Sequence, residues 1–238
     1  MNNQFIRSIT FDWEKISTNS YLRGIKALQG VEEIVLSHPV TFFVGENGSG
    51  KSTLLEAIAV AHGFNPEGGT KNYAFSTCDT HSELWEAIRV VKGVRREKFG
   101  YFLRAESFYN VATQEEEYAD GGHTSAGYHK QSHGESFLAL AQDVVGAEGL
   151  YLFDEPEAAL SPQRQLTLLA EIDCYAKAGA QFIIVTHSPI LLGLPDAQIL
   201  CFDNGRIHPC AYEETDSYRV TEMFINHRRT LLKQLLED

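Results

Sequence analysis

The stretch that decides the fold is Gly45-Glu46-Asn47-Gly48-Ser49-Gly50-Lys51-Ser52, which fits the pattern G-x-x-x-x-G-K-[ST] at every fixed position. An apolar run, Val40–Val44, precedes it, and a periodic segment, Lys51–His62, follows it. A strand, a glycine-rich loop and a helix in this order predict a phosphate-binding loop. Its glycines let successive backbone N–H groups turn inward around phosphate oxygens, and the start of the helix adds a partial positive charge.

The polar residues of this loop have separate predicted roles. Lys51 can reach the β- and γ-phosphates as a compact charge, and the Ser52 hydroxyl is suited to bind Mg²⁺. A glycine-rich turn with an incidental lysine is the alternative, but the strand before it and the helix after it argue against that reading. The predicted ATP contacts are Gly45, Glu46, Asn47, Gly48, Ser49, Gly50, Lys51, Ser52 and Thr53.

Two acids follow a second apolar segment. Leu150–Phe153 leads directly into Asp154 and Glu155. At the end of a buried strand near the phosphate-binding loop, Asp154 can hold Mg²⁺ through its water shell. Glu155 can orient or deprotonate the attacking water. An isolated Asp–Glu pair most often just opens a solvated loop, but this pair has the loop and the strand as its context.

Gln131–Glu135 is a candidate for a second anion site. It precedes the periodic segment Phe137–Ala141, which places Ser132 and Gly134 at the N-terminus of a predicted helix. The hydroxyl and the exposed N–H groups of such a helix start bind anions. Because one ATP is already held by the loop, this site is most useful if it faces the γ-phosphate of a partner subunit's ATP. An ordinary, well-capped helix start explains the same residues equally well.

His187 lies just past the apolar segment Phe182–Val185, where α/β sheets place residues that contact ligands. From there a histidine can hydrogen-bond the γ-phosphate and the attacking water. A lone histidine at a strand end is usually structural, so its functional reading depends on the combination with the other motifs.

Short apolar segments alternate with longer periodic ones, which is typical of a mostly parallel sheet in an α/β fold. The predicted strands are Phe5–Phe11, Val40–Val44, Tyr101–Leu103, Leu150–Phe153, Phe182–Val185 and Ile199–Phe202. The predicted helices are Lys51–His62, Ser82–Lys92, a helix that begins at Ser161-Pro162, and one from Ser217 onward with a break near Asn226. Asp203-Asn204-Gly205 predicts a tight hairpin turn.

Composition narrows the class of protein. Hydrophobic residues make up 43% of the 238 residues, and the formal net charge is −12. No apolar run exceeds five residues, so we expect neither a transmembrane helix nor a secretory signal, and a cytoplasmic chain with no direct membrane insertion. The acidic balance argues against nucleic-acid binding by the whole surface but leaves a local basic groove open. The four cysteines form no C-x-x-C pair, so we expect four unpaired thiols.

The order of these motifs resembles that of the ABC-type ATPase superfamily, in particular its soluble SMC- and RecF-like branch and small bacterial predicted AAA-family ATPases. The matching motifs are Walker A (Gly45–Ser52), signature (Gln131–Glu135), Walker B (Leu150–Glu155), D-loop (Ala158–Ser161) and switch histidine (His187). The resemblance implies one ATPase domain over residues 1–238. It has a mostly parallel core, antiparallel N-terminal strands and a helical subdomain over about residues 72–148.

The resemblance also implies an ATP-dependent, head-to-tail homodimer that traps ATP between the loop of one copy and Ser132, Gly134 and Glu135 of the other. Three departures stand out. In the signature, His133 replaces a glycine and Gln131 a leucine. The Q-loop glutamine of the family has no clear counterpart after Tyr101–Leu103, where Glu106 is the candidate for its Mg²⁺ contact. Too few residues separate the loop from the signature for a long coiled coil.

Three functions are therefore considered. The leading one is a Mg²⁺-dependent ATPase whose ATP-bound dimer acts as a switch, with Lys51, Glu155 and His187 as catalytic residues. The second is the nucleotide-binding subunit of a membrane transporter, which normally requires the missing glutamine. The third is an ATP sensor within a DNA-repair or phage-defence assembly, and the intact acids at Asp154 and Glu155 argue against a loss of catalysis. A protein partner is compatible with each function, and the sequence names none.

Overall fold

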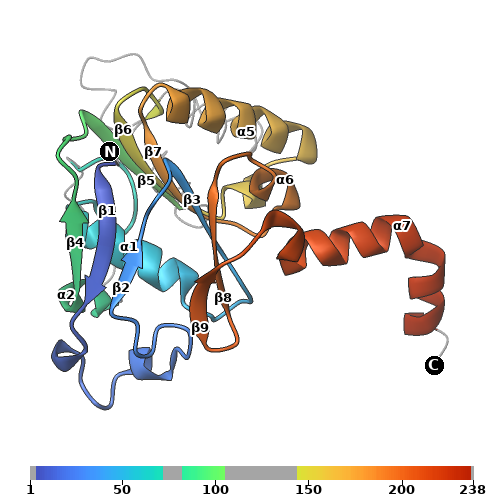
Figure 1. Cartoon of the computed structure of the whole chain (residues 1–238), viewed down its shortest axis with the longest axis horizontal. Coiled ribbons are helices and arrows are strands. Elements are labelled where there is room, and N and C mark those ends of the chain that lie inside the picture. The colour runs from blue at the N-terminus through green and yellow to red at the C-terminus, as the bar shows by residue number, and fades with distance from the viewer. Residues whose placement is uncertain (1–3, 72–81, 105–143, 237–238) are drawn as a thin grey trace.

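The computed structural model describes residues 4–71, 82–104 and 144–236. Within them the chain forms two sheets, one of three antiparallel strands in the order β2-β1-β4 and one of six strands in the order β5-β6-β7-β3-β8-β9 (Figure 1). The strands are β1 (Ile6–Phe11), β2 (Glu33–Val35), β3 (Val40–Val44), β4 (Ile88–Lys92), β5 (Phe99–Arg104), β6 (Gly149–Asp154), β7 (Gln181–Val185), β8 (Gln198–Asp203) and β9 (Arg206–Pro209).

The α-helices are α1 (Lys51–His62), α2 (Leu84–Ala87), α5 (Pro162–Lys177), α6 (Pro189–Leu192) and α7 (Asp216–Leu236). Short 3₁₀ turns cover Trp13–Lys15, Tyr21–Gly24, Pro156–Ala159 and Tyr212–Glu214. In the six-stranded sheet, β5, β6, β7, β3 and β8 run parallel, and β9 pairs antiparallel with β8 at the edge. The predicted α/β fold with a mostly parallel sheet is confirmed.

The larger sheet is covered on both faces. On one face, α1 and the antiparallel sheet bury a cluster that includes Ile58, Phe43 and Leu152. On the other face, α5 and α6 bury a second cluster that includes Ile172 and Phe153. Neighbouring residues of β6 point to opposite clusters, which explains why this strand is apolar at every position before Asp154. The central strands are thereby fixed from both sides.

The predicted strands are all present, but the predicted helix Ser82–Lys92 is wrong in its second half. A single helical turn, α2, ends at Ala87, and Ile88–Lys92 forms β4, which pairs antiparallel with β1. The segment is rich in Ile and Val, whose branched side chains suit a pleated sheet. The local start signal at Ser82, whose hydroxyl accepts from the Leu84 N–H at 3.3 Å, stabilises only that one turn.

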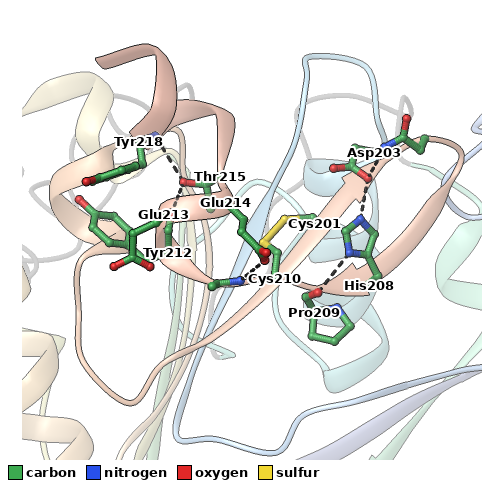
Figure 2. The surroundings of a disulfide bond; sticks show 12 residues. Cys201, Asp203, His208, Pro209, Cys210, Tyr212, Glu213, Glu214, Thr215 and Tyr218 are labelled. Carbon is green, nitrogen blue, oxygen red and sulfur yellow. Dashed lines mark hydrogen bonds and ion pairs between the residues drawn. A yellow bond between two sulfur atoms is a disulfide. The ribbon is translucent and has the colours of Figure 1, made fainter. Parts of the chain in front are cut away.

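The prediction of four unpaired thiols is also wrong, because Cys201 and Cys210 form a disulfide (Figure 2). The predicted turn explains the pairing: Asn204 and Gly205 have positive φ and reverse the chain between β8 and β9. This hairpin brings two cysteines nine residues apart to a Cα–Cα distance of 6.3 Å. A search for C-x-x-C spacing cannot find such a cross-strand pair. Among the described residues Cys174 is free and exposed, and Cys78 lies outside them.

The C-terminal helix α7 leaves the body of the molecule (Figure 1). It has no buried residue, and the predicted break is confirmed as a kink at His227, where φ is −123° and ψ is 25°. None of the helices in the described part of the chain is both long and apolar enough to cross a lipid bilayer.

Candidate nucleotide-binding site

The candidate site lies at the carboxyl ends of the parallel strands. β3 leads into the phosphate-binding loop, β6 ends at Asp154, and β7 leads into His187. Because β7 pairs with both β3 and β6, these three strand ends are neighbours at one edge of the sheet. Ligands of open α/β sheets bind at this edge. The topology therefore brings together groups that are more than a hundred residues apart in the sequence.

The backbone of the loop requires glycine at specific positions. Gly45, Gly48 and Gly50 have φ of +145°, +80° and +96°. A Cβ atom on Gly45 would lie 2.5 Å from the carbonyl oxygen of Phe202, and one on Gly50 would lie 2.6 Å from Cγ2 of Ile25. A side chain at either position would therefore push the loop away from β8 or from the segment that precedes β2.

Lys51 is enclosed by the loop. Its Nζ donates to the carbonyl oxygens of Gly45 at 2.8 Å and Glu46 at 2.7 Å, and the residue is 4% exposed. Burial lowers the pKa of the ammonium group, and the nearby charges of Glu155, Asp154 and Glu157 act in the opposite direction. The cation is thus held inside the curve of the loop, where an oxyanion can replace the carbonyl oxygens.

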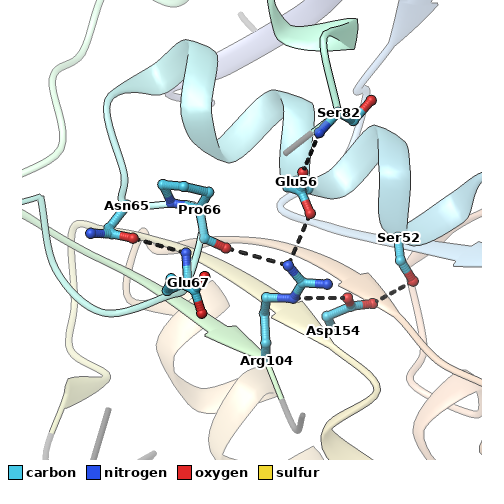
Figure 3. Close-up of polar contacts among 8 residues, drawn as sticks. All are labelled: Ser52, Glu56, Asn65, Pro66, Glu67, Ser82, Arg104 and Asp154. Carbon is cyan, nitrogen blue, oxygen red and sulfur yellow. Dashed lines mark hydrogen bonds and ion pairs between the residues drawn. The ribbon is translucent and has the colours of Figure 1, made fainter. Parts of the chain in front are cut away.

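Ser52 and Asp154 are in direct contact. The Ser52 hydroxyl at the start of α1 donates to Oδ1 of Asp154 at 2.8 Å (Figure 3). Asp154 is buried, and its Oδ2 lies 3.7 Å from Nε of Arg104. A hydroxyl oxygen and a carboxylate oxygen are therefore already side by side next to Lys51, which is the combination of ligands that a hard cation such as Mg²⁺ accepts.

Glu155 and His187 form the outer part of the site. Glu155 has the left-handed conformation, φ 51° and ψ 52°, and its N–H donates to the carbonyl oxygen of Val185 at 2.9 Å. Its Oε1 lies 3.8 Å from Nε2 of His187, and both side chains are more than a third exposed. Strained backbone of this kind clusters at functional sites. The Glu155 side chain and part of the His187 ring reach solvent, whereas Nε2 of His187 is itself buried and has no hydrogen-bond partner among the described residues.

Glu157 is a site residue that the sequence reasoning missed. Its Oε1 accepts from the backbone N–H of His187 at 2.5 Å, so it fixes the position of the turn after β7. Ser188 holds the other end of this turn, because its hydroxyl caps α6 and donates to Gln165 at 2.6 Å. The available signal was a third acid close behind Asp154 and Glu155, although spacing alone does not show which backbone group it contacts.

Arg104 is the second residue that was missed. It ends β5, directly opposite Asp154 in the register of the β5–β6 pair. A cation that ends an apolar strand next to the acidic strand end was the signal for it. The resemblance directed attention to Glu106 instead, which lies outside the described residues.

Several predicted residues cannot be placed. Ser132, Gly134 and Glu135, which form the proposed second anion site, lie outside the described residues, as does His133. The structure thus brings together the loop, Asp154, Glu155 and His187 and does not place the signature. Within the described part of the chain, no group of three or more His, Cys, Asp or Glu residues forms a cation site.

A cleft of about 590 Å³ lies along the outer side of the loop. It is lined by Glu46–Ser49, by Lys26, by the hairpin turn Asp203–Gly205 and by the first turn of α7, including Arg219. Its lining mixes acids with bases. This cleft gives the loop solvent space on the side of the hairpin turn and α7.

Two family models match consecutive parts of the chain. One, described as an AAA domain, matches residues 21–136, and the other, described as "AAA domain, putative AbiEii toxin, Type IV TA system", matches residues 136–193. The curated relatives include the cytochrome c biogenesis ATP-binding export protein CcmA of Roseobacter denitrificans. It is 27% identical over 202 residues, which cover 79% of this chain and 89% of the relative. The hemin import ATP-binding protein HmuV of Pseudomonas aeruginosa is 28% identical over 215 residues, 82% of this chain and 84% of the relative.

These matches support a place for the chain among the ABC-type ATPases, because the relatives are ATP-binding proteins and both family models describe an AAA domain. The phosphate-binding loop stands at the position of the Walker A motif of such proteins. Similar solved structures include the SMC head domain from Thermotoga maritima, with a TM-score of 0.47, 14% identity, and coverage of 87% of this chain and 99% of that one. Another is a putative metal-chelate type ABC transporter in an inward-facing conformation, with a TM-score of 0.48, 17% identity, and coverage of 94% of this chain and 90% of that one.

Proposed function

We propose that this ABC-type ATPase binds ATP together with Mg²⁺ at the Walker A loop and hydrolyses the bond between the β- and γ-phosphates, which gives ADP and phosphate. The single observation that carries the proposal is the contact between Ser52 and Asp154 beside the enclosed ammonium group of Lys51. Three groups with the chemistry for a metal-bound triphosphate converge there, two from the start of α1 and one from the end of β6. A glycine-rich turn with an incidental lysine has no reason to meet a buried acid from another strand.

The residues present fit Mg²⁺. Ser52 and Asp154 would hold the cation, because they supply hard oxygen ligands and leave positions for phosphate and water. When bound, Mg²⁺ neutralises charge on the phosphate oxygens. The protein's own groups account for the remaining chemistry.

Hydrolysis requires a positioned water and stabilisation of the charge that develops on the γ-phosphate. Glu155 accepts the proton of the attacking water, and the neighbouring His187 imidazole orients that water or a phosphate oxygen through a hydrogen bond. The Lys51 ammonium, released from the loop carbonyls, stabilises negative charge on the phosphate. Glu157 holds the backbone of His187 and thereby the direction of its ring.

We further propose that the active form is a head-to-tail homodimer of a single ATPase domain, residues 1–238, with a helical subdomain over about residues 72–148. Ser132, Gly134 and Glu135 of one copy would then contact the ATP of the other. The exposed side chains of Glu155 and His187 favour this arrangement, because a second copy can cover them and exclude water. Sedimentation analysis with ATP, with ADP and without nucleotide tests it. Dimers formed only with ATP are expected, and a constant monomer contradicts the proposal.

The decisive substitution is Glu155→Gln. It keeps the size of the side chain and removes the base, so we expect ATP binding to persist and turnover to fall at least ~10²-fold. Phosphate release and equilibrium ATP binding are measured on the same preparation. Glu171→Gln, on α5 away from the strand ends, is the matched control and is expected to leave both unchanged. Unchanged turnover in Glu155→Gln removes Glu155 from its proposed role.

A second function is favoured by the names of the relatives. CcmA and HmuV are named as an export and an import ATP-binding protein, and on this likeness the second proposal is that the chain is the nucleotide-binding subunit of a membrane transporter. Such a subunit requires an integral membrane partner. Affinity purification from detergent-solubilised membranes tests this alternative, since a stoichiometric membrane protein is expected only if the transporter reading is correct.

A further inference from the structure

Arg104 is a largely buried cation beside the acid that ends β6. Its Nε lies 3.7 Å from Oδ2 of Asp154, and the two side chains are 18% and 9% exposed. The two residues are opposite each other in the parallel β5–β6 pair, so the sheet itself sets their separation. The carboxylate next to Ser52 therefore has a fixed positive neighbour supplied by the protein.

The guanidinium group is held in place from α1. Its Nη1 donates to Oε2 of Glu56 at 2.9 Å and to the carbonyl oxygen of Pro66 at 3.3 Å. Glu56 lies one helical turn after Ser52, so both point from the same face of α1 toward the strand ends (Figure 3). Ser52 thus contacts one oxygen of Asp154, and Arg104, fixed by Glu56, lies beside the other.

The charges at this edge give the arrangement a consequence for nucleotide binding. Asp154, Glu155 and Glu157 all act on Lys51 through their negative charge. A triphosphate that approaches without a cation is repelled by the same carboxylates. Arg104 faces two carboxylates, Glu56 at 2.9 Å and Asp154 at 3.7 Å, and offsets part of their combined negative charge. It does so at short distances and with little solvent screening, which is where charge interactions are strongest.

We propose that Arg104 is a positioning residue that holds the Asp154 carboxylate against Ser52 and reduces the negative charge of this edge before a divalent cation arrives. With Ser52 on one oxygen and Arg104 beside the other, the Asp154 carboxylate repels cation-free ATP less strongly. The carboxylate is also already oriented when Mg²⁺ enters with the nucleotide. This role rests on the proposed function, because it assumes that ATP and Mg²⁺ bind beside Asp154. It is separate from hydrolysis and is measurable without turnover.

The test is equilibrium binding of ATP by calorimetry, once with excess Mg²⁺ and once with EDTA, to wild type and to Arg104→Gln. We expect the ratio of the dissociation constants in EDTA and in Mg²⁺ to rise roughly tenfold in Arg104→Gln. With Mg²⁺ present the cation itself offsets and orients the Asp154 carboxylate, whereas cation-free ATP meets the full charge of that carboxylate. Arg104→Lys keeps the charge and is expected to stay within about threefold of the wild-type ratio. Arg95→Gln, which removes a partly exposed arginine bonded to Glu148, is the matched control with an unchanged ratio.

The outcomes are distinct. An unchanged ratio overturns the proposal. If both dissociation constants rise by the same factor, Arg104 is a purely structural residue. If Arg104→Gln does not fold, Arg104→Lys decides, since a tenfold larger ratio in that variant contradicts a role that depends on charge. Wild type that binds no ATP in either condition overturns the proposed function itself, whereas normal wild-type binding with an unaffected Arg104→Gln overturns only the role of Arg104.

Discussion

The helices α1 and α7 differ most in what they contact. Seven of the twelve residues of α1 are buried, and the helix lies between the two sheets. In contrast, α7 is longer, with 21 residues, and buries none. It is anchored at its start, where the Thr215 hydroxyl accepts from the Tyr218 N–H at 3.3 Å and the rings of Tyr212 and Tyr218 lie 4.7 Å apart.

This difference shows how the molecule holds its Walker A loop. The loop itself has little side-chain packing, because it consists mostly of glycine and small polar residues. Its position comes from the elements on either side, buried β3 and buried α1, and through α1 the core also fixes Ser52 and Glu56 relative to the strand ends. The core thus determines the geometry of the site, whereas nothing comparable among the described residues determines the direction of α7.

The largest effect is expected from a core substitution in α1. Leu55 is fully buried, so Leu55→Ala removes apolar contacts and leaves a cavity, which costs about 2–5 kcal/mol of unfolding free energy. Urea denaturation followed by circular dichroism measures it. Leu166→Ala, at a leucine of α5 that is 54% exposed, is the control and should cost less than about 0.5 kcal/mol. Equal costs for the two variants would mean that Leu55 of α1 contributes no more to stability than the exposed Leu166 of α5.

The second largest effect is a dependence of the unfolding free energy on pH, caused by His62 at the end of α1. His62 is buried, with Nε2 2.9 Å from Oε1 of Glu97. Burial, helped by the charge of Lys71, lowers the pKa of His62 to about 4. Because the ordinary value is about 6.5, the unfolded chain takes up the proton first as the pH falls. The stability that the neutral imidazole contributes is therefore present above pH 6.5 and is lost as the pH falls toward 4.

When the pH falls from 7 to 5, the protonation of His62 in the unfolded chain lowers the unfolding free energy by about 2 kcal/mol. Urea denaturation of wild type and His62→Gln at both pH values measures it as the difference between their losses of stability. Other titrating groups, including the raised pKa of His208 caused by its hydrogen bond with Asp203, are shared by both proteins and cancel. Glu97 does not interfere: burial alone would raise its pKa, but hydrogen bonds, that of Lys71 first, lower it to about 2. Identical losses in the two proteins would contradict a neutral, buried His62.

The sequence predicted the elements whose signals are local. The glycine pattern and the helix signals gave α1 its bounds, and fully apolar segments gave β3, β6 and β7. The hairpin turn at Asn204 and the kink at His227 were likewise visible in the residues concerned. At Ile88–Lys92 a helix start competes with β-branched residues, and only the presence of β1 as a partner decides for the strand.

The parts that were missed depend on which strands are neighbours. Arg104 meets Asp154 because β5 pairs with β6, and Cys201 meets Cys210 because β8 pairs with β9. No spacing in the sequence indicates the first contact, and the second could be inferred only by combining the predicted hairpin turn with the positions of the two cysteines on either side of it. Glu157 is close to the predicted acids along the chain, but its partner is the backbone of His187, which arrives from β7.

The smallest effect is expected in α7, and it is the sharpest test of the contrast with α1. Phe224 is 41% exposed and Ile225 is 70% exposed, so Phe224→Ala and Ile225→Ala should each change the unfolding free energy by less than about 0.5 kcal/mol. Because an isolated helix is marginal in water, the backbone amides of α7 beyond its first turn should exchange with D₂O far faster than those of α1. Hydrogen exchange read by mass spectrometry on wild type compares the two helices directly. Slow exchange in α7, or a loss of 2 kcal/mol in Phe224→Ala, would show that this helix is packed in solution and that its apolar residues are covered.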